Sequence, residues 1–445
     1  MTDMEQNGLT RRTFAGRTAA TVGSMTMLGS FLAACGGSDS KDGAAAGGGG
    51  GGTMQFWKFA SENDDPIIKG AVDRWNKENP DSKVDFQTFP PDQYSGTKLT
   101  TAFAAKKGPD VFWISPGAFI NYVNNGVAEP VDDLIDKSTY NPASVTAVSV
   151  DGKMYSLPFE QEPVALYYRK DILEKAGIEP PRTWDDLRAA AKELTTKKQK
   201  GIVIEPTPGG YQNFTWYPFL WSAGGNVLSE DSKKSALNTP EAASAFQLWG
   251  DLMKDGYAPK KTAQLTSELG PLGRGEAAMQ VCGFWGIGQM KNLFKDVDYG
   301  VVKIPAPAGR QSVTVYGGWT QMVNAQGGNV AKAKEFTKWL WVQDKEFPDN
   351  WACRNGSKFS PNNAVNEGCE DVFSKGAYKT FRDEVLPTAQ AEPRYPDQIV
   401  KAIGDGLQAA MFSGKSGEEA ASQAAKAIDS YLSSYQGAPL NPTQT

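Results

Sequence analysis

The chain has 445 residues, about three times the usual size of one domain, so we expect two lobes rather than a single hydrophobic core. It contains no histidine, which excludes Ser-His-Asp and Cys-His nucleophilic sites, histidine-ligated zinc and a histidine general base. The formal charge is −5, from 46 basic and 51 acidic residues, and the basic residues form no long cluster. A surface for nucleic acid or for anionic lipid is therefore not indicated.

The first 34 residues have the pattern of a targeting segment. Arg11 and Arg12 precede a weakly apolar stretch, 18–34, which is too short and too polar to be a membrane span. The stretch ends in Leu32-Ala33-Ala34-Cys35, small residues followed by a cysteine. Residues 1–34 resemble a twin-arginine signal joined to a lipoprotein cleavage box, after which Cys35 becomes the lipidated first residue. A buried N-terminal helix with a chance cysteine is the alternative.

Residues 35–52 are predicted to be a tether. They include a run of six glycines, 47–52, which has no side chains to bury and much backbone entropy to lose. We therefore expect a protein exported by the twin-arginine route and held by lipid at the extracytoplasmic face of a bacterial membrane. That compartment is oxidising, so cysteines can pair there. Cys353 and Cys369 flank a loop that suits a disulfide, whereas Cys282 ends an apolar run and is expected to be buried.

From Thr53 onward, strands and helices alternate. The first block has predicted strands at 54–59, 84–89 and 110–114, separated by predicted helices at 66–79, 94–107 and 116–125. This spacing predicts parallel βαβ units. A second block has apolar β runs at 164–168, 201–204, 277–282 and 299–304, with helices at 183–195 and 241–254. The chain then passes Gly317-Gly318-Trp319 into another strand and ends with helices at 330–342, 398–412 and 418–435.

Seven short motifs along this α/β pattern carry a family resemblance. They lie at 108–113, 126–130, 152–158, 166–171, 181–187, 277–279 and 283–285. In this order, from about Thr53 to Tyr435, the chain resembles the solute-binding lipoproteins of ABC importers, in the branch similar to maltose-binding protein.

The resemblance implies an α/β fold of two lobes, each a mostly parallel sheet flanked by helices, joined by three crossings of a hinge. Lobe 1 would comprise 53–161 plus 319–355, and lobe 2 would comprise 162–318 plus 356–445. The first crossing is expected at 159–163, the second at 316–321 and the third between 342 and 363. Ligands of such folds bind in crevices at the carboxyl ends of parallel strands.

The ligand residues of the family carry over to fourteen positions. Flat aromatic rings bury the apolar face of a pyranose, while carboxylates, amides and Arg bond to its hydroxyls. Asp64 has the alternative role of capping a helix, and at most one of the hinge acids Glu160 and Glu162 is expected to bind. The candidate positions are Trp57, Ser61, Glu62, Asp64, Trp113, Ser115, Glu160, Glu162, Gln212, Asn213, Trp285, Gly318, Trp319 and Arg394.

The predicted function is a monomeric receptor that hands a neutral oligosaccharide to importer permease subunits, with no cofactor, no metal and no chemistry on the ligand. One alternative is the same fold binding a glycerol phosphodiester, but only Lys58 and Arg394 qualify as cations for it. A glycoside hydrolase or a serine acylase is the other alternative. The acylase patterns at 95–98, 122–124 and 415–417 are short enough to arise by chance.

Overall fold

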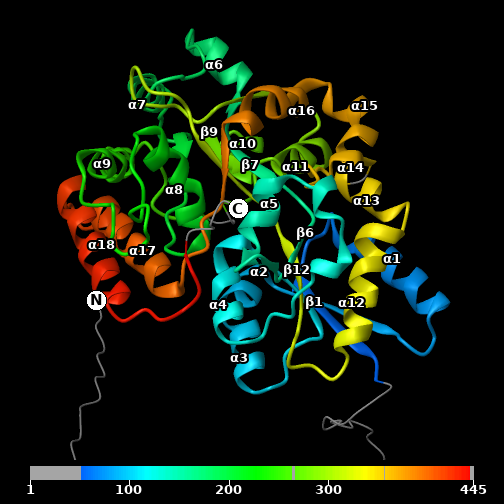
Figure 1. Ribbon diagram of the computed structural model, residues 1–445. Coiled ribbons are helices and arrows are strands. Elements are labelled where there is room, and N and C mark those ends of the chain that lie inside the picture. The colour runs from blue at the N-terminus through cyan, green and yellow to red at the C-terminus, as the bar shows by residue number, and fades with distance from the viewer. Residues whose placement is uncertain (1–51, 263–265, 355, 441–445) are drawn as a thin grey trace, which may run out of the picture. The chain divides into compact units, whose positions relative to one another are not determined.

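The computed structural model describes residues 52–262, 266–354 and 356–440 (Figure 1). The predicted signal peptide, Cys35 and nearly all of the predicted tether lie outside the described residues. Within the described ranges, no helix is both long and apolar enough to cross a membrane.

The first sheet has the strand order β2-β1-β3-β12-β6. β1 (Met54–Phe59) pairs in parallel with β2 (Val84–Phe89) and β3 (Val111–Ile114), whereas β12 (Thr320–Val323) is antiparallel to β3 and to β6 (Leu157–Pro158). Helix α1 (Asp65–Glu78) has a proline in its first turn and buries an apolar stripe that includes Ile68, Val72 and Trp75.

The second sheet is built around the long strand β7 (Glu162–Arg169). Its order is β13-β11-β7-β9-β8, from β13 (Ala389–Ala391), β11 (Thr314–Gly317), β9 (Ala277–Gly283) and β8 (Lys200–Val203), and β10 (Tyr299–Val302) also pairs with β7. β7 is antiparallel to β9, β10 and β11, and only the pairs β11–β13 and β8–β9 are parallel.

Within the described residues, β12 in the first sheet and β7 in the second run against the other strands of their sheets, which share one direction. The expectation of mostly parallel sheets is therefore confirmed, and each sheet contains one antiparallel strand. Strands β7 and β12 enter their sheets directly from the hinge, without the helical crossover that makes a strand parallel to its predecessor. The strand-helix spacing predicted the parallel strands β1, β2 and β3, but an apolar run has the same pattern in either direction, so the sequence carried no signal that β7 and β12 are antiparallel.

Helices cover the sheets, and five of the longer ones are α7 (Trp184–Glu193), α8 (Gly210–Ser222), α9 (Pro240–Lys254), α17 (Asp397–Phe412) and α18 (Gly417–Leu432). Figure 1 shows α9, α17 and α18 gathered beside α8. α18 approaches α9 so closely that a Cβ added to Gly417 would lie 2.0 Å from the Ala243 carbonyl oxygen, which requires glycine there.

The remaining α-helices and strands are shorter. They are α2 (Pro91–Gln93), α3 (Leu99–Ala104), α4 (Phe119–Asn124), α5 (Pro142–Ala147), α6 (Lys170–Ala176), α10 (Gly270–Gly273), α11 (Gly286–Leu293), α12 (Val330–Lys338), α13 (Phe347–Asp349), α14 (Asn363–Gly368), α15 (Glu370–Phe373) and α16 (Gly376–Thr380), with a hairpin of β4 (Ser149–Val150) and β5 (Lys153–Met154).

The chain passes between the sheets at three places. Residues 159–161 connect β6 to β7, and Gly318-Trp319 connect β11 to β12. A Cβ added to Gly318, whose φ is +118°, would lie 2.2 Å from the Glu160 carbonyl oxygen, so the first two crossings touch. At the third, Trp351 packs 5.3 Å from the ring of Trp113 in the first sheet.

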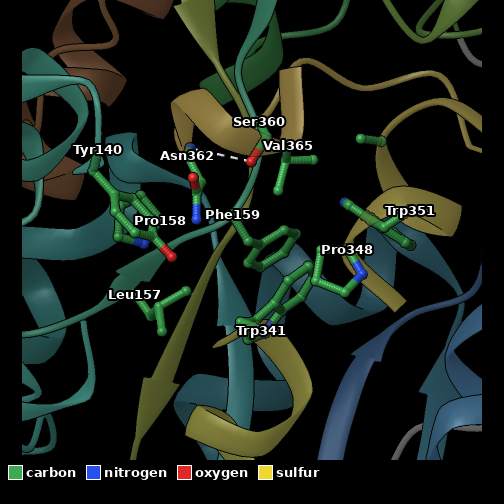
Figure 2. Close-up of a pocket in the computed structure, with 11 residues that line it drawn as sticks. Tyr140, Leu157, Pro158, Phe159, Trp341, Pro348, Trp351, Ser360, Asn362 and Val365 are labelled. Carbon is green, nitrogen blue, oxygen red and sulfur yellow. Dashed lines mark hydrogen bonds between the residues drawn. The ribbon is translucent and has the colours of Figure 1, made fainter. Parts of the chain in front are cut away.

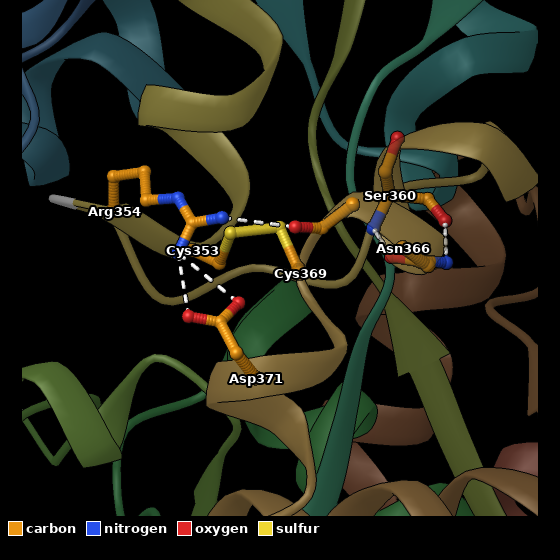
Figure 3. The surroundings of a disulfide bond; sticks show 7 residues. Cys353, Arg354, Ser360, Asn366, Cys369 and Asp371 are labelled. Carbon is orange, nitrogen blue, oxygen red and sulfur yellow. Dashed lines mark hydrogen bonds and ion pairs between the residues drawn. A yellow bond between two sulfur atoms is a disulfide. The ribbon is translucent and has the colours of Figure 1, made fainter.

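A disulfide joins Cys353 and Cys369, the pair that the sequence predicted, with Cα atoms 5.8 Å apart (Figure 3). Beside it, Arg354 forms an ion pair of 2.9 Å with Asp371. Cys282 is free and buried. The disulfide thus fixes the third crossing to the start of α15.

Candidate ligand-binding site

The first crossing carries two buried acids. Glu160 and Glu162 are 3% and 5% exposed, and Oε1 of Glu160 accepts a hydrogen bond of 2.7 Å from the Trp319 amide. Nζ of Lys358, on the third crossing, lies 3.1 Å from Oε1 of Glu162 and 3.7 Å from Oδ2 of Asp64. All three hinge crossings and the start of α1 therefore meet in one cluster of charged side chains, which we call the hinge cluster: Asp64, Glu160, Glu162 and Lys358.

Burial dominates the electrostatics of the hinge cluster. It raises the pKa of Glu160 well above the ordinary range, and the charge of Glu162 adds to that shift. Burial also raises the pKa of Glu162, with Lys358 acting in the opposite direction. Burial alone would lower the pKa of Lys358, but the carboxylates around it, first Asp64 and then Glu162, raise it instead. Among the described residues, no group of side chains has the composition of a metal site.

The loop between β1 and α1 is organised by a second ion pair. Nζ of Lys58, fully buried, lies 2.5 Å from Oδ1 of Asp65 and 4.6 Å from the centre of the Phe59 ring. The other carboxylate oxygen of Asp65 accepts a hydrogen bond of 3.1 Å from the Ser61 amide. Asp64 stands at the N-cap of α1 without a side-chain capping bond. Its carboxylate faces Lys358, so the alternative role of Asp64 as a helix cap is not the one observed.

Two aromatic groups flank the crossings, one from each sheet. Trp319 packs on Phe59, with ring centres 4.4 Å apart. Trp285 lies 6.3 Å from Tyr211 and 6.4 Å from Phe214, and its Nε1 donates 2.7 Å to the Ser267 carbonyl oxygen. A Cβ added to Gly317 would lie 2.7 Å from the Phe214 ring, so the second aromatic group reaches the crossing that carries Trp319.

Two donors near these aromatic groups lack a partner. Among the described residues, neither Nε1 of Trp57 nor the hydroxyl of Tyr211 makes a hydrogen bond, although both atoms are buried. The ammonium group of Lys98 lies 4.8 Å from the centre of the Trp57 ring. A buried donor without an acceptor is costly, so a ligand oxygen at either atom would be favourable.

Several predicted ligand residues have their side chains engaged within the protein or outside the hinge cluster. Trp113 has no exposed surface, and its Nε1 donates 3.1 Å to Gln321 within the first sheet. In α8, Gln212 and Asn213 donate to backbone oxygens of Glu205 (3.0 Å) and Val400 (2.9 Å). Glu62 is exposed, and Ser115 is half-buried before a short helix, Pro116–Ala118.

Arg394 is also engaged within the protein. It is 3% exposed, donates to the Ser149 carbonyl oxygen and lies 5.8 Å from the centre of the Phe119 ring. Burial lowers the pKa of Arg394 to about 10.

Sequence reasoning missed two residues of the candidate site: Lys358 in the hinge cluster and Tyr211 in the aromatic group of Trp285. The expectation that only Lys58 and Arg394 supply cations was therefore incomplete, because Lys358 is a third. Lys358 lies in an irregular segment with no periodicity, and Tyr211 lies in a helix that was not predicted. Only the tertiary contacts reveal the position of each.

A small apolar cavity lies next to the first and third crossings (Figure 2). The rings of Phe159, Trp341 and Trp351 line it, together with Ser360 and Asn362, which are joined by a hydrogen bond of 3.1 Å. None of the predicted ligand residues lines this cavity. We therefore assign it to the packing of the hinge and place the candidate site at the hinge cluster and the two aromatic groups.

The chain forms two sheets flanked by helices and passes between them through a hinge, where charged and aromatic side chains gather. This is the two-lobed fold of periplasmic binding proteins. A solved structure of a Listeria monocytogenes ABC substrate-binding protein in complex with cycloalternan has this fold, with a TM-score of 0.75 at 22% identity, covering 86% of this chain and 99% of that one. The chain belongs to the family of bacterial extracellular solute-binding proteins, whose family model matches residues 59–341.

Relatives in sequence agree with this family. A binding protein of Brucella abortus is 29% identical over 367 residues, which are 79% of this chain and 85% of that protein. An arabinooligosaccharide-binding protein of Halalkalibacterium halodurans is 26% identical over 320 residues, 66% of this chain and 68% of that one. The family is one of extracellular solute-binding proteins, so this chain binds a solute outside the cytoplasm.

Proposed function

We propose that this protein is a receptor that holds a neutral oligosaccharide between its two lobes and delivers it to the permease subunits of an ABC importer. The observation that carries the proposal is the convergence of Trp319 and Trp285, from opposite sheets, on a hinge that also presents the buried acids Glu160 and Glu162. Stacking rings and hydrogen-bonding carboxylates are the chemistry that recognises a sugar. The name of the arabinooligosaccharide-binding relative supports the same class of ligand.

The proposal assigns lobe 1 to residues 53–161 plus 319–355 and lobe 2 to 162–318 plus 356–445. Lipid on Cys35, after export by the twin-arginine route, would hold the protein at the membrane, with residues 36–52 as the tether. The receptor is a monomer and does no chemistry on its ligand. Trp319 and Trp285 stack on sugar faces, and the free oxygen of Glu160 accepts from a hydroxyl.

The cations near the site favour a neutral ligand over a phosphodiester. Lys58 is paired with Asp65, and Lys358 with Glu162 and Asp64. Arg394 is bonded to a backbone oxygen. A ligand phosphate at the hinge cluster would therefore meet paired cations and additional carboxylates, whereas a hydroxyl can donate to those carboxylates.

A sugar-binding screen tests the proposal. We expect Trp285→Ala to weaken binding by more than about tenfold, because a buried aromatic contact with the ligand is worth at least about 1.4 kcal/mol. Trp339→Ala is the matched control, since Trp339 packs on Trp75, 5.3 Å away, within lobe 1. Calorimetry gives the affinities, and thermal melts confirm that both variants fold.

The identity and recovery of the ligand decide between the alternatives. A sugar that binds and is recovered unchanged supports the receptor. Binding of a glycerol phosphodiester but of no sugar would keep the fold and overturn the ligand class, and a cleaved sugar would reveal an enzyme.

A further inference from the structure

Glu392 lies where the second crossing meets the opposite lobe. It follows β13, and its amide donates 2.9 Å to the Tyr316 carbonyl oxygen, which fixes it beside β11. A Cβ added to Gly117 would lie 2.3 Å from Oε1 of Glu392, and one added to Gly317 would lie 3.4 Å from Oε2. The carboxylate therefore fills the space between two glycines that come from different sheets.

Gly117 belongs to the first sheet's side of the molecule. It lies in the short helix Pro116–Ala118, directly after β3, whereas Gly317 ends β11 of the second sheet. Oε1 of Glu392 lies against the Gly117 backbone, and this polar contact lowers the pKa of the Glu392 carboxyl. One side chain thus spans from the second sheet to the loop that follows a central strand of the first.

Three further hydrogen bonds join the same two lobes. Nδ2 of Asn121, in α4, donates 2.9 Å to Asp397 in α17, and Nδ2 of Asn124 donates 3.1 Å to the Tyr435 hydroxyl. Arg394 donates a hydrogen bond to the Ser149 carbonyl oxygen, again from one lobe to the other. Of these contacts, the Glu392 contact is the one next to the second crossing and to Phe214.

Glu392 is half-buried as a residue, with its carboxylate at the contact between the two lobes. Burial raises the pKa of Glu392 to about 8, with the contact to the Gly117 backbone acting in the opposite direction. Within the described parts of the chain, no Lys or Arg forms an ion pair with it; the neighbouring ionisable group is Tyr217, in α8, whose pKa is raised first by burial and then by the charges of Tyr395 and Glu392. The contact with the Gly117 backbone of the opposite lobe therefore offsets part of the cost of desolvating this carboxyl.

We propose that Glu392 is a positioning residue for lobe closure: its contact with the Gly117 backbone stabilises the closed arrangement in which the ligand is held. This inference rests on the proposed function, because closure over a ligand gives the contact its role. A contact made only when the lobes are closed shifts the equilibrium toward the binding-competent state and so raises the apparent affinity.

A double-mutant cycle on Gly117 and Glu392 tests the role of their contact. Gly117 does not have a positive φ, so Gly117→Ala adds a methyl group whose main conflict is with Glu392. We expect Gly117→Ala to weaken sugar binding about tenfold in the wild-type background, and by less than about twofold in a Glu392→Ala background, where the methyl group has room. Gly70→Ala is the matched control, because a Cβ there meets nothing within 4 Å. Unchanged affinity in Gly117→Ala, or an equal loss in both backgrounds, would overturn the proposal.

A second readout needs no sugar. In the full chain labelled with ¹⁵N-glycine, we expect the Gly117 amide signal to titrate with the Glu392 carboxyl, at a midpoint near its pKa of about 8, and to lose this titration in Glu392→Gln. If the Gly117 amide signal titrates in the same way in Glu392→Gln as in the wild type, the contact between Gly117 and Glu392 is contradicted. If no variant binds any sugar but the Gly117 amide responds, the proposed function fails while the contact stands.

Discussion

Glu160 holds its carboxyl in a buried place where ionisation is disfavoured. Its folded pKa is raised above the ordinary value by burial and then by Glu162, so its contribution to stability is complete at acid pH and is lost as pH rises toward the folded pKa. Glu160→Gln retains an oxygen to accept from the Trp319 amide but removes the ionisation. We expect the variant to match the wild type near pH 4 and to melt at an increasingly higher temperature than the wild type as pH rises to 8.

Thermal melts from pH 4 to pH 8 check whether the difference in melting temperature between Glu160→Gln and the wild type grows with pH. Glu384→Gln, at an exposed acid, is the control and should show no growing difference. A Glu160→Gln variant that loses stability relative to the wild type as pH rises would mean that the hinge cluster needs the ionised form of Glu160.

Lys358 is the cation of the hinge cluster. Its side chain is 9% exposed and that of Glu162 is 6% exposed, so removing the ammonium group leaves buried carboxylates without a partner. We expect Lys358→Met to lower the free energy of unfolding by about 3–5 kcal/mol, measured by urea denaturation. Lys401→Met is the control: the pair of Lys401 with Asp405 is exposed, and its loss should be about 0–1 kcal/mol. Equal, small losses in both variants would contradict a buried ion pair at the hinge.

At the scale of elements, the disulfide joins the third crossing to the helices that follow it. Cys353 and Cys369 are 16 residues apart in sequence, and closing a loop of that length stabilises the folded state by about 3 kcal/mol. We expect the Cys353→Ser/Cys369→Ser variant to unfold at a correspondingly lower urea concentration. Reductant should lower the midpoint of the wild type toward that of the variant and leave the variant unchanged. A wild type insensitive to reductant would show that the bond contributes little.

The elements also show what the sequence could and could not predict. β1 and β2 have the predicted bounds, because their apolar runs lie between clear turn residues. α8 was missed because it is buried on nearly every side and contains Pro218, so it has no polar stripe to give a helical period. Trp113 was a candidate ligand residue, but β3 is buried along its whole length, which a run of four apolar residues does not distinguish from a cleft edge.

The contacts between crossings were beyond sequence reasoning for a different reason. The partners in the hinge cluster and around Glu392 come from segments far apart in the chain, as with Asp64 and Lys358 or Gly117 and Glu392. Composition and periodicity report local structure, whereas these pairs depend on how the two sheets are joined. The resemblance supplied the hinge acids Glu160 and Glu162, but it did not supply Lys358, the cation that pairs with Glu162 and Asp64.

At the scale of the whole molecule, one buried apolar cluster includes Phe56 of the first sheet and Trp216 of α8, so the core continues through the hinge. A continuous core and three crossings couple the two lobes energetically. We therefore expect one cooperative thermal transition in calorimetry, coincident with the loss of the near-ultraviolet aromatic signal. A bound sugar at 100 times its dissociation constant should shift that single transition upward, since it stabilises the folded state by about 2.7 kcal/mol. Two transitions, of which the sugar moves only one, would show that the lobes unfold independently and that the ligand binds one lobe rather than the space between them.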